Sequence, residues 1–113
     1  MNAELLCPAD QLKTFTHTAA ADYSAGDMQL INGLLSIAYA DIANGDEGEM
    51  VYSAALVEAP KAAVQIDAPE VAYWDDTAKN ITNISTGNTK CGLFTESFAS
   101  SDENCVFELQ NVI

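Results

Sequence analysis

The sequence predicts a small all-β domain, either a single β-sandwich or a β-barrel, with an extended arm at its N-terminus. Its 113 residues suit one domain, and 49% of them are apolar, which is enough to bury a core. From residue 12 onward, short alternating or apolar runs are broken by glycine, asparagine and aspartate about every 8–12 residues, a spacing typical of all-β domains. No segment offers three clear helical turns, so helices are not expected.

The arm is predicted over residues 1–11 and the β-rich domain over residues 12–113. The arm lacks alternation and contains Cys7-Pro8, so we expect it either to be loose or to lie on a partner. The expected strands are residues 12–18, 28–32, 34–40, 49–58, 71–74, 80–84, 91–98 and 105–110. Pro60 is expected to end a strand ladder or to lie on a sheet edge, because proline has no N–H to donate.

Turn chemistry predicts a meander of three strands at the C-terminal end. Residues 80–84 would pair with 91–98 across Gly87-Asn88, and residues 91–98 would pair again with 105–110. A loop centred near residues 100–101 places Cys91 opposite about residue 110 and Cys105 opposite about residue 96. A disulfide between these two cysteines is therefore disfavoured, and the third cysteine, Cys7, forms no CxxC pair with either.

Charge excludes two classes of partner. The chain has 17 acidic and 4 basic residues, a formal net charge of −13, and all four cations are lysines. Nucleic acid and anionic membranes are not expected to bind, because no basic patch can neutralise phosphates. The longest apolar run is far shorter than a membrane helix, and no basic region precedes an apolar stretch at the N-terminus. We therefore expect a soluble protein made in the cytoplasm.

Catalytic motifs are missing from the sequence. His17 is its single histidine, and no GxSxG elbow accompanies it. Histidine and cysteine are too scattered for a zinc site, and Gly87-Asn88-Thr89-Lys90 does not match the GxxxxGK[ST] phosphate loop. We expect neither an enzyme nor a bound cofactor. One alternative stays open, a small acidic ligand- or calcium-binding β-domain that acts as a surface adhesion module. Its candidate loop contains the oxygen-bearing residues Asn44, Asp46, Glu47 and Glu49, although their spacing is not that of an EF-hand.

An ordered set of short motifs runs through nearly the whole chain, over about residues 12–112. The motifs are Ala25-Gly26-Asp27, Leu34-Leu35-Ser36-Ile37-Ala38, Gly48-Glu49-Met50-Val51, Pro60-Lys61-Ala62, Tyr73-Trp74-Asp75, Thr86-Gly87-Asn88 and Gly92-Leu93-Phe94. This order resembles a family of small tailed-bacteriophage and prophage head proteins, the capsid cement or decoration proteins, whose members are often labelled recombinase-like. The sequence departs from the family pattern at Glu58-Ala59, where an apolar residue usually precedes the proline.

The resemblance implies a structural protein of the virion, located on the outer surface of the capsid. It would bind the major capsid protein and clamp adjacent subunits, as a homo-oligomer for which a trimer is the expected form. It implies no nucleic acid, membrane or small-molecule partner. The candidate contact residues are Leu5, Leu6 and Leu12 in and beside the arm, Pro60 and Lys61 at the proline motif, and the consecutive aromatic residues Tyr73 and Trp74.

Overall fold

The computed structural model describes residues 3–110 and shows an all-β chain, as the sequence predicts. Residues 1–2 of the expected arm and residues 111–113 of the expected domain lie outside the described residues. One curled sheet forms a half-barrel rather than two packed sheets. Its strands are β1 (Glu4–Leu5), β2 (Leu12–Thr18), β3 (Met28–Ile31), β4 (Leu34–Ala38), β5 (Glu47–Pro60), β6 (Glu70–Asp75), β7 (Asn80–Thr82), β8 (Thr89–Phe94) and β9 (Asn104–Gln110), with a short 3-10 turn, η1 (Ala9–Gln11), before β2.

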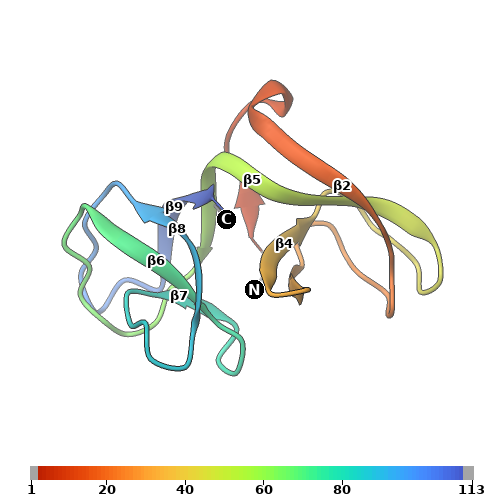
Figure 1. Cartoon of the computed structure of the whole chain (residues 1–113). Coiled ribbons are helices and arrows are strands. Elements are labelled where there is room, and N and C mark those ends of the chain that lie inside the picture. The colour runs from red at the N-terminus through yellow and green to blue at the C-terminus, as the bar shows by residue number, and fades with distance from the viewer. Residues whose placement is uncertain (1–2, 111–113) are drawn as a thin grey trace.

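The long strand β5 organises the whole sheet. The sheet order is β3-β4-β5-β9-β8-β6-β7, and β1 and β2 both pair with the other edge of β5. Figure 1 shows β5 crossing between two lobes of the molecule. The first lobe contains β2, β3, β4 and the early part of β5, and the second contains β6 to β9 and the end of β5. β5 ends at Pro60, where the sequence predicts that the ladder stops.

A tight turn sets the register of β3 and β4. Asn32 and Gly33 both have positive φ, 51° and 85°, which is the geometry of a two-residue type I′ hairpin. Ile31 therefore pairs with Leu34, and Met28 with Ile37. Apolar side chains on both faces of β4 are buried, so this hairpin is held between the main core and a smaller cluster that includes Ala38, Ile42 and Met50.

The C-terminal pairing is partly as predicted. β8 pairs with β9, with Gly92 opposite Leu109 and Leu93 opposite Glu108. One further step of this register places residue 110 opposite Cys91, as the sequence predicts, whereas residue 96 lies past the end of β8 and Cys105 pairs with Ala59 of β5. All three cysteines are free.

The predicted pairing of residues 80–84 with residues 91–98 is wrong, because β6 lies between β7 and β8. The Asp75 side chain accepts hydrogen bonds from the Thr77 and Ala78 N–H groups, both at 3.0 Å, and Lys79 adopts a positive φ of 59°. These features make a tight turn, which pairs β7 with β6 instead.

The free edge of β7 closes the second lobe. Lys61, just after β5, forms an isolated bridge with Ile81, and the Ala62 N–H donates to the Ile81 oxygen at 2.9 Å. The order β5-β9-β8-β6-β7 therefore returns to the chain that follows β5. Phe94 and Phe107 fill the interior of this lobe, with ring centroids 6.5 Å apart.

Candidate functional site

The described part of the N-terminal arm, residues 3–11, lies against its own chain. Glu4 and Leu5 pair with Glu58 and Val57 of β5, and the Leu6 N–H donates to the Leu56 oxygen at 2.9 Å. Leu5 is half-buried against the main core, whereas Leu6 is 42% exposed. Leu12, the first residue of β2, is also half-buried. The arm therefore adds a strand to the sheet of its own chain and leaves one leucine side chain at the surface.

Two of the predicted contact residues are buried. Trp74 is 1% exposed, and its indole N–H donates to the Asp76 carboxylate at 3.0 Å. Lys61 is 6% exposed, and its ammonium group donates to the main-chain oxygens of Ala62 and Val64 at 2.7 and 2.8 Å. Tyr73 and Pro60 are half-buried. The structure therefore separates the predicted set into a buried pair and residues that reach the surface.

Large apolar side chains are also exposed at two positions that sequence reasoning missed. Tyr39 is 50% exposed and Ile84 is 49% exposed. Both fall inside segments predicted as strands, residues 34–40 and 80–84, but β4 ends at Ala38 and β7 at Thr82. Each side chain lies just past the end of its strand. An accurate prediction of the strand ends would have identified both residues.

A shallow groove connects Tyr39 with the arm. Its volume is about 240 Å³, and its lining residues are Ala3, Glu4, Leu5, Ala25, Gly26, Ala38 and Tyr39. The Ala3 N–H donates to the Gly26 oxygen at 2.9 Å, which fixes the arm at the base of the groove. Alanine and glycine residues make up four of the seven lining residues, and the larger side chains are those of Glu4, Leu5 and Tyr39.

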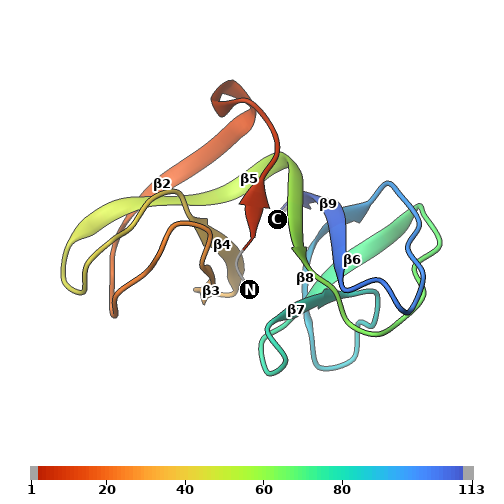
Figure 2. The same cartoon turned by 180° about the vertical axis from the view of Figure 1, so that it is seen from behind.

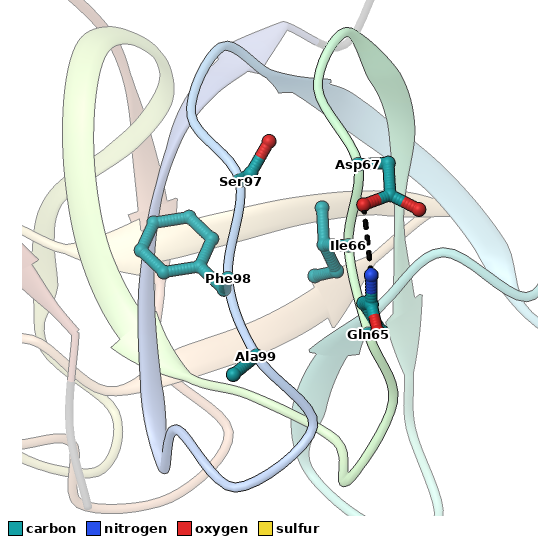
Figure 3. A pocket seen from close by; sticks show the side chains of 6 residues that line it. All are labelled: Gln65, Ile66, Asp67, Ser97, Phe98 and Ala99. Atoms are coloured by element: carbon teal, nitrogen blue, oxygen red, sulfur yellow. Dashed lines mark hydrogen bonds between the residues drawn. The ribbon is translucent and has the colours of Figure 1, made fainter.

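A second hollow, of about 290 Å³, lies in the second lobe where two extended segments meet. Ile66 and Phe98 exchange main-chain hydrogen bonds, both 2.9 Å long. Figure 3 shows the Gln65 amide donating to the Asp67 carboxylate, with Ser97 and Phe98 on the facing segment. The Ser97 hydroxyl accepts a hydrogen bond from the Ala68 N–H. The polar groups of this hollow therefore bond to each other and to the main chain, and they form no nucleophile–base pair.

The titratable groups do not form a reactive centre. Burial raises the pKa of the Cys91 thiol and raises that of Cys105 to about 12, so both thiols stay protonated at neutral pH. The ring of His17 stacks on that of Tyr23, with centroids 6.5 Å apart. Within residues 3–110, no group of three or more His, Cys, Asp or Glu side chains is placed to hold a metal ion.

The loop of the calcium alternative is organised by other contacts. The Asn44 N–H donates to the Asp22 carboxylate at 2.8 Å, and the Asp46 N–H donates to the Ala43 oxygen at 2.9 Å. Glu47 and Glu49 lie on β5, where Glu49 accepts a hydrogen bond from the Thr16 hydroxyl at 3.0 Å. The candidate ligands are thus divided between a turn and a strand.

The surface is strongly acidic. Lys61 is buried, and Lys79 forms an ion pair with Asp76 at 2.9 Å. Hydrogen bonds from Lys79 and Trp74 lower the pKa of the Asp76 carboxyl. Lys13 and Lys90 are exposed. Because the formal net charge is −13, the surface offers an anionic partner little attraction. The described part of the chain contains no helix of the length and hydrophobicity that a membrane crossing requires.

Comparison with known proteins identifies the family. A family model described as phage cement protein matches residues 8–109. No curated protein and no solved structure matches the chain significantly. The matched segment runs from the residue before η1 to the next-to-last residue of β9, so it spans the strands of both lobes and leaves out β1. The chain belongs to the phage cement protein family.

Proposed function

We propose that this protein binds the outer surface of an assembled bacteriophage head and stabilises the contacts between major capsid protein subunits. Membership of the phage cement family, over residues 8–109, is the observation that carries this proposal. The family gives the chain a structural role in the phage capsid rather than an enzymatic one. The outer position and the partner are our inference.

Electrostatics supports the outer position. The inner face of a filled head contacts densely packed DNA, which repels a protein with a net charge of −13. One lysine is buried and another is paired with a carboxylate, so few cations remain to offset that repulsion. On the outer face, the same charge keeps free copies apart in solution until the shell provides a complementary site.

Exposed apolar side chains supply the proposed contacts. Leu6, Tyr39 and Ile84 are between 42% and 50% exposed, and a partner that covers such side chains removes their apolar surface from water, which favours binding. Leu6 belongs to the arm, and Tyr39 lines the groove beside it. Leu5, Leu12, Pro60 and Tyr73 lie at half-buried margins, where a partner would contact part of each side chain. The buried residues Lys61 and Trp74 support the second lobe from inside.

Stabilisation then follows from mass action. A protein that binds the assembled shell but not dissociated subunits lowers the free energy of the shell, and many copies multiply a modest energy per site. A homo-oligomer, with a trimer as the expected form, is part of this proposal. Sedimentation of the free chain measures its oligomeric state, and sedimentation of the shell-bound chain measures how many copies the shell holds.

The decisive experiment mixes the purified chain with expanded, DNA-free shells assembled from the major capsid protein of its own phage. We expect the chain to co-sediment with the shells and to raise their melting temperature. Leu6→Ser should weaken co-sedimentation, whereas Ala55→Ser, an exposed control on β5, should not. Failure of the unmodified chain to bind expanded shells of its own phage would disprove the proposed function.

A further inference from the structure

The outer edge of β2 is open. β2 pairs with β5 along its seven residues, and no other strand within residues 3–110 pairs with it. In both views β2 lies at the margin of the first lobe, with β5 on one side and no strand beyond it (Figures 1 and 2). β3, the other margin of this lobe, is only four residues long. β2 is therefore the longest open strand edge in the described part of the chain.

The hydrogen bonds of β5 show which groups of β2 face outward. The Tyr39 N–H donates to the Glu49 oxygen at 3.1 Å, so the main-chain groups of Glu49 point away from β2. In an antiparallel ladder, the N–H and C=O of one residue point to the same side. Thr16 lies opposite Glu49, so its N–H and C=O point to the open edge. By the two-residue period of a strand, Thr14 and Thr18 do the same.

This edge has little of the protection that exposed edges usually carry. Native proteins block such edges with proline, lysine or bulges. Residues 14–18 contain neither proline nor lysine, and the irregularity in the pairing lies before them, between Lys13 and Thr14. The three threonines are all exposed. Their six main-chain donors and acceptors are ready to pair with an added strand.

The surrounding charge indicates what kind of strand fits. Residues 14–60 contain no lysine, and their acidic residues are Asp22, Asp27, Asp41, Asp46, Glu47, Glu49 and Glu58. Glu47 and Glu49 are exposed and lie directly opposite Thr18 and Thr16 in the register, on the same face of the ribbon. A second copy of this chain would bring the same carboxylates to the edge and be repelled. A segment with lysine or arginine at these positions would be attracted.

The opposite face of β2 presents rings. Phe15 and His17 alternate with the threonines and are half-buried, with ring centroids 6.2 Å apart. The Phe15 ring also lies 6.1 Å from that of Tyr52. Apolar side chains of an added strand would pack beside these rings, because cross-strand neighbours share a face. The two faces together select a segment in which cationic and apolar residues alternate.

We infer that the open edge of β2 accepts an extended segment of a partner protein as an added strand. Its cationic side chains lie near Glu47 and Glu49, and its apolar side chains lie beside Phe15 and His17. This inference rests on the proposed capsid role and names the chemistry of the contact segment that the shell protein provides.

The test uses two ten-residue peptides of equal charge, one alternating lysine and valine and one with five lysines followed by five valines. Affinities are measured by calorimetry, and amide protection by NMR. We expect the alternating peptide to bind about tenfold more tightly than the block peptide and to slow hydrogen exchange at Thr14, Thr16 and Thr18. Equal affinities, or no protection of these amides, would overturn the inference.

Substitutions separate the edge from general electrostatic attraction. Thr16→Pro removes an outward N–H and leaves the β2–β5 ladder intact, since proline is tolerated at such positions. Thr16→Pro should lower the affinity for the alternating peptide about tenfold, whereas Thr16→Val should change this affinity less than about twofold. If Thr16→Pro does not fold, the double variant Glu47→Gln/Glu49→Gln replaces it. This variant should bind more weakly than Glu96→Gln/Glu103→Gln, which changes the net charge equally at exposed sites in the second lobe.

The same variants distinguish this inference from the proposed function. Shells that bind the unmodified chain and Thr16→Pro equally well would leave the capsid role intact and overturn strand addition. Shells that bind neither chain would overturn the capsid role, while the peptide results still decide whether the edge accepts a strand.

Discussion

Lys61 shows how one side chain can determine local structure from inside the protein. Its ammonium group donates to the Ala62 and Val64 oxygens, and its main-chain N–H donates to the Glu103 oxygen at 2.9 Å. These bonds hold the chain at the point where β7 closes the second lobe. The sequence places this lysine in a proline motif but gives no sign of its burial, because lysine is rarely buried.

Replacing Lys61 by methionine should destabilise the fold. Two partly buried carbonyl oxygens would lose their donor, and we expect the free energy of unfolding to fall by about 2 kcal/mol. Urea titration followed by circular dichroism measures this change. Lys90→Met removes the same charge at an exposed position and should change stability by less than about 0.5 kcal/mol. Equal effects of the two substitutions would contradict a structural role for the buried ammonium group.

The buried thiols make the free energy of unfolding depend on pH in the alkaline range. Burial, and to a smaller degree the charge of Glu58, raise the pKa of Cys105 from 9.0 to about 12, against an opposing effect of Lys61. Above pH 9.0 the unfolded chain loses this proton while the folded chain keeps it, so deprotonation stabilises the unfolded state. The contribution is complete below pH 9.0 and is lost as the pH rises towards about 12.

We therefore expect the free energy of unfolding to fall between pH 9.0 and about 12. The slope should reach about 1.4 kcal/mol per pH unit for one buried thiol. Urea titrations at stepped pH, on the unmodified chain and on Cys105→Ala, isolate this thiol from lysine and tyrosine, which titrate in the same range. Parallel curves for the two proteins would show that Cys105 does not carry the effect.

At the scale of elements, the sequence predicts where the strands lie better than which strands pair with each other. The alternation in residues 12–18 and 105–110 locates β2 and, to within one residue, β9. The predicted loop centre near residues 100–101 also agrees with the observed register of β8 and β9. The β6–β7 hairpin was missed because its turn depends on Asp75 accepting main-chain hydrogen bonds, which residue spacing alone does not reveal. The turn residues Gly87-Asn88 favoured β8 as the neighbour of β7, whereas the Asp75 turn pairs β7 with β6.

The close approach of β8 and β9 depends on Gly92. A Cβ atom at this position would overlap the main-chain oxygen of Glu108. Gly92→Ala should therefore force the two strands apart and lower the free energy of unfolding by about 3 kcal/mol, the upper end for overpacking. Gly87→Ala, in an open turn with φ of 74°, should lower it by only about 1 kcal/mol. Thermal unfolding of both variants measures the difference, and equal losses would contradict the steric role of Gly92.

At the scale of the whole molecule, one strand joins two lobes, and no local pattern predicts this arrangement. The alternation within β5 indicates a strand but not that four others pair with it. Pairing of β1 with the same strand likewise depends on contacts between residues more than fifty positions apart. The candidate contact residues were separated by this long-range packing, which buried Trp74 and Lys61 and left Leu6 exposed. Their chemistry was predictable from sequence, whereas their exposure was not.

The net charge of −13 makes the free molecule sensitive to ions in general rather than to calcium. Raising sodium chloride from about 20 to 200 mM should raise the melting temperature, since salt screens repulsion among the carboxylates. Millimolar calcium and magnesium chloride, compared at equal ionic strength, should raise it equally, because the oxygen-bearing residues near Asn44 are divided between a turn and β5. Scanning calorimetry measures these shifts. A larger shift with calcium than with magnesium would support the alternative of a calcium-binding module and would place its site in this loop if Asp46→Asn abolished the difference.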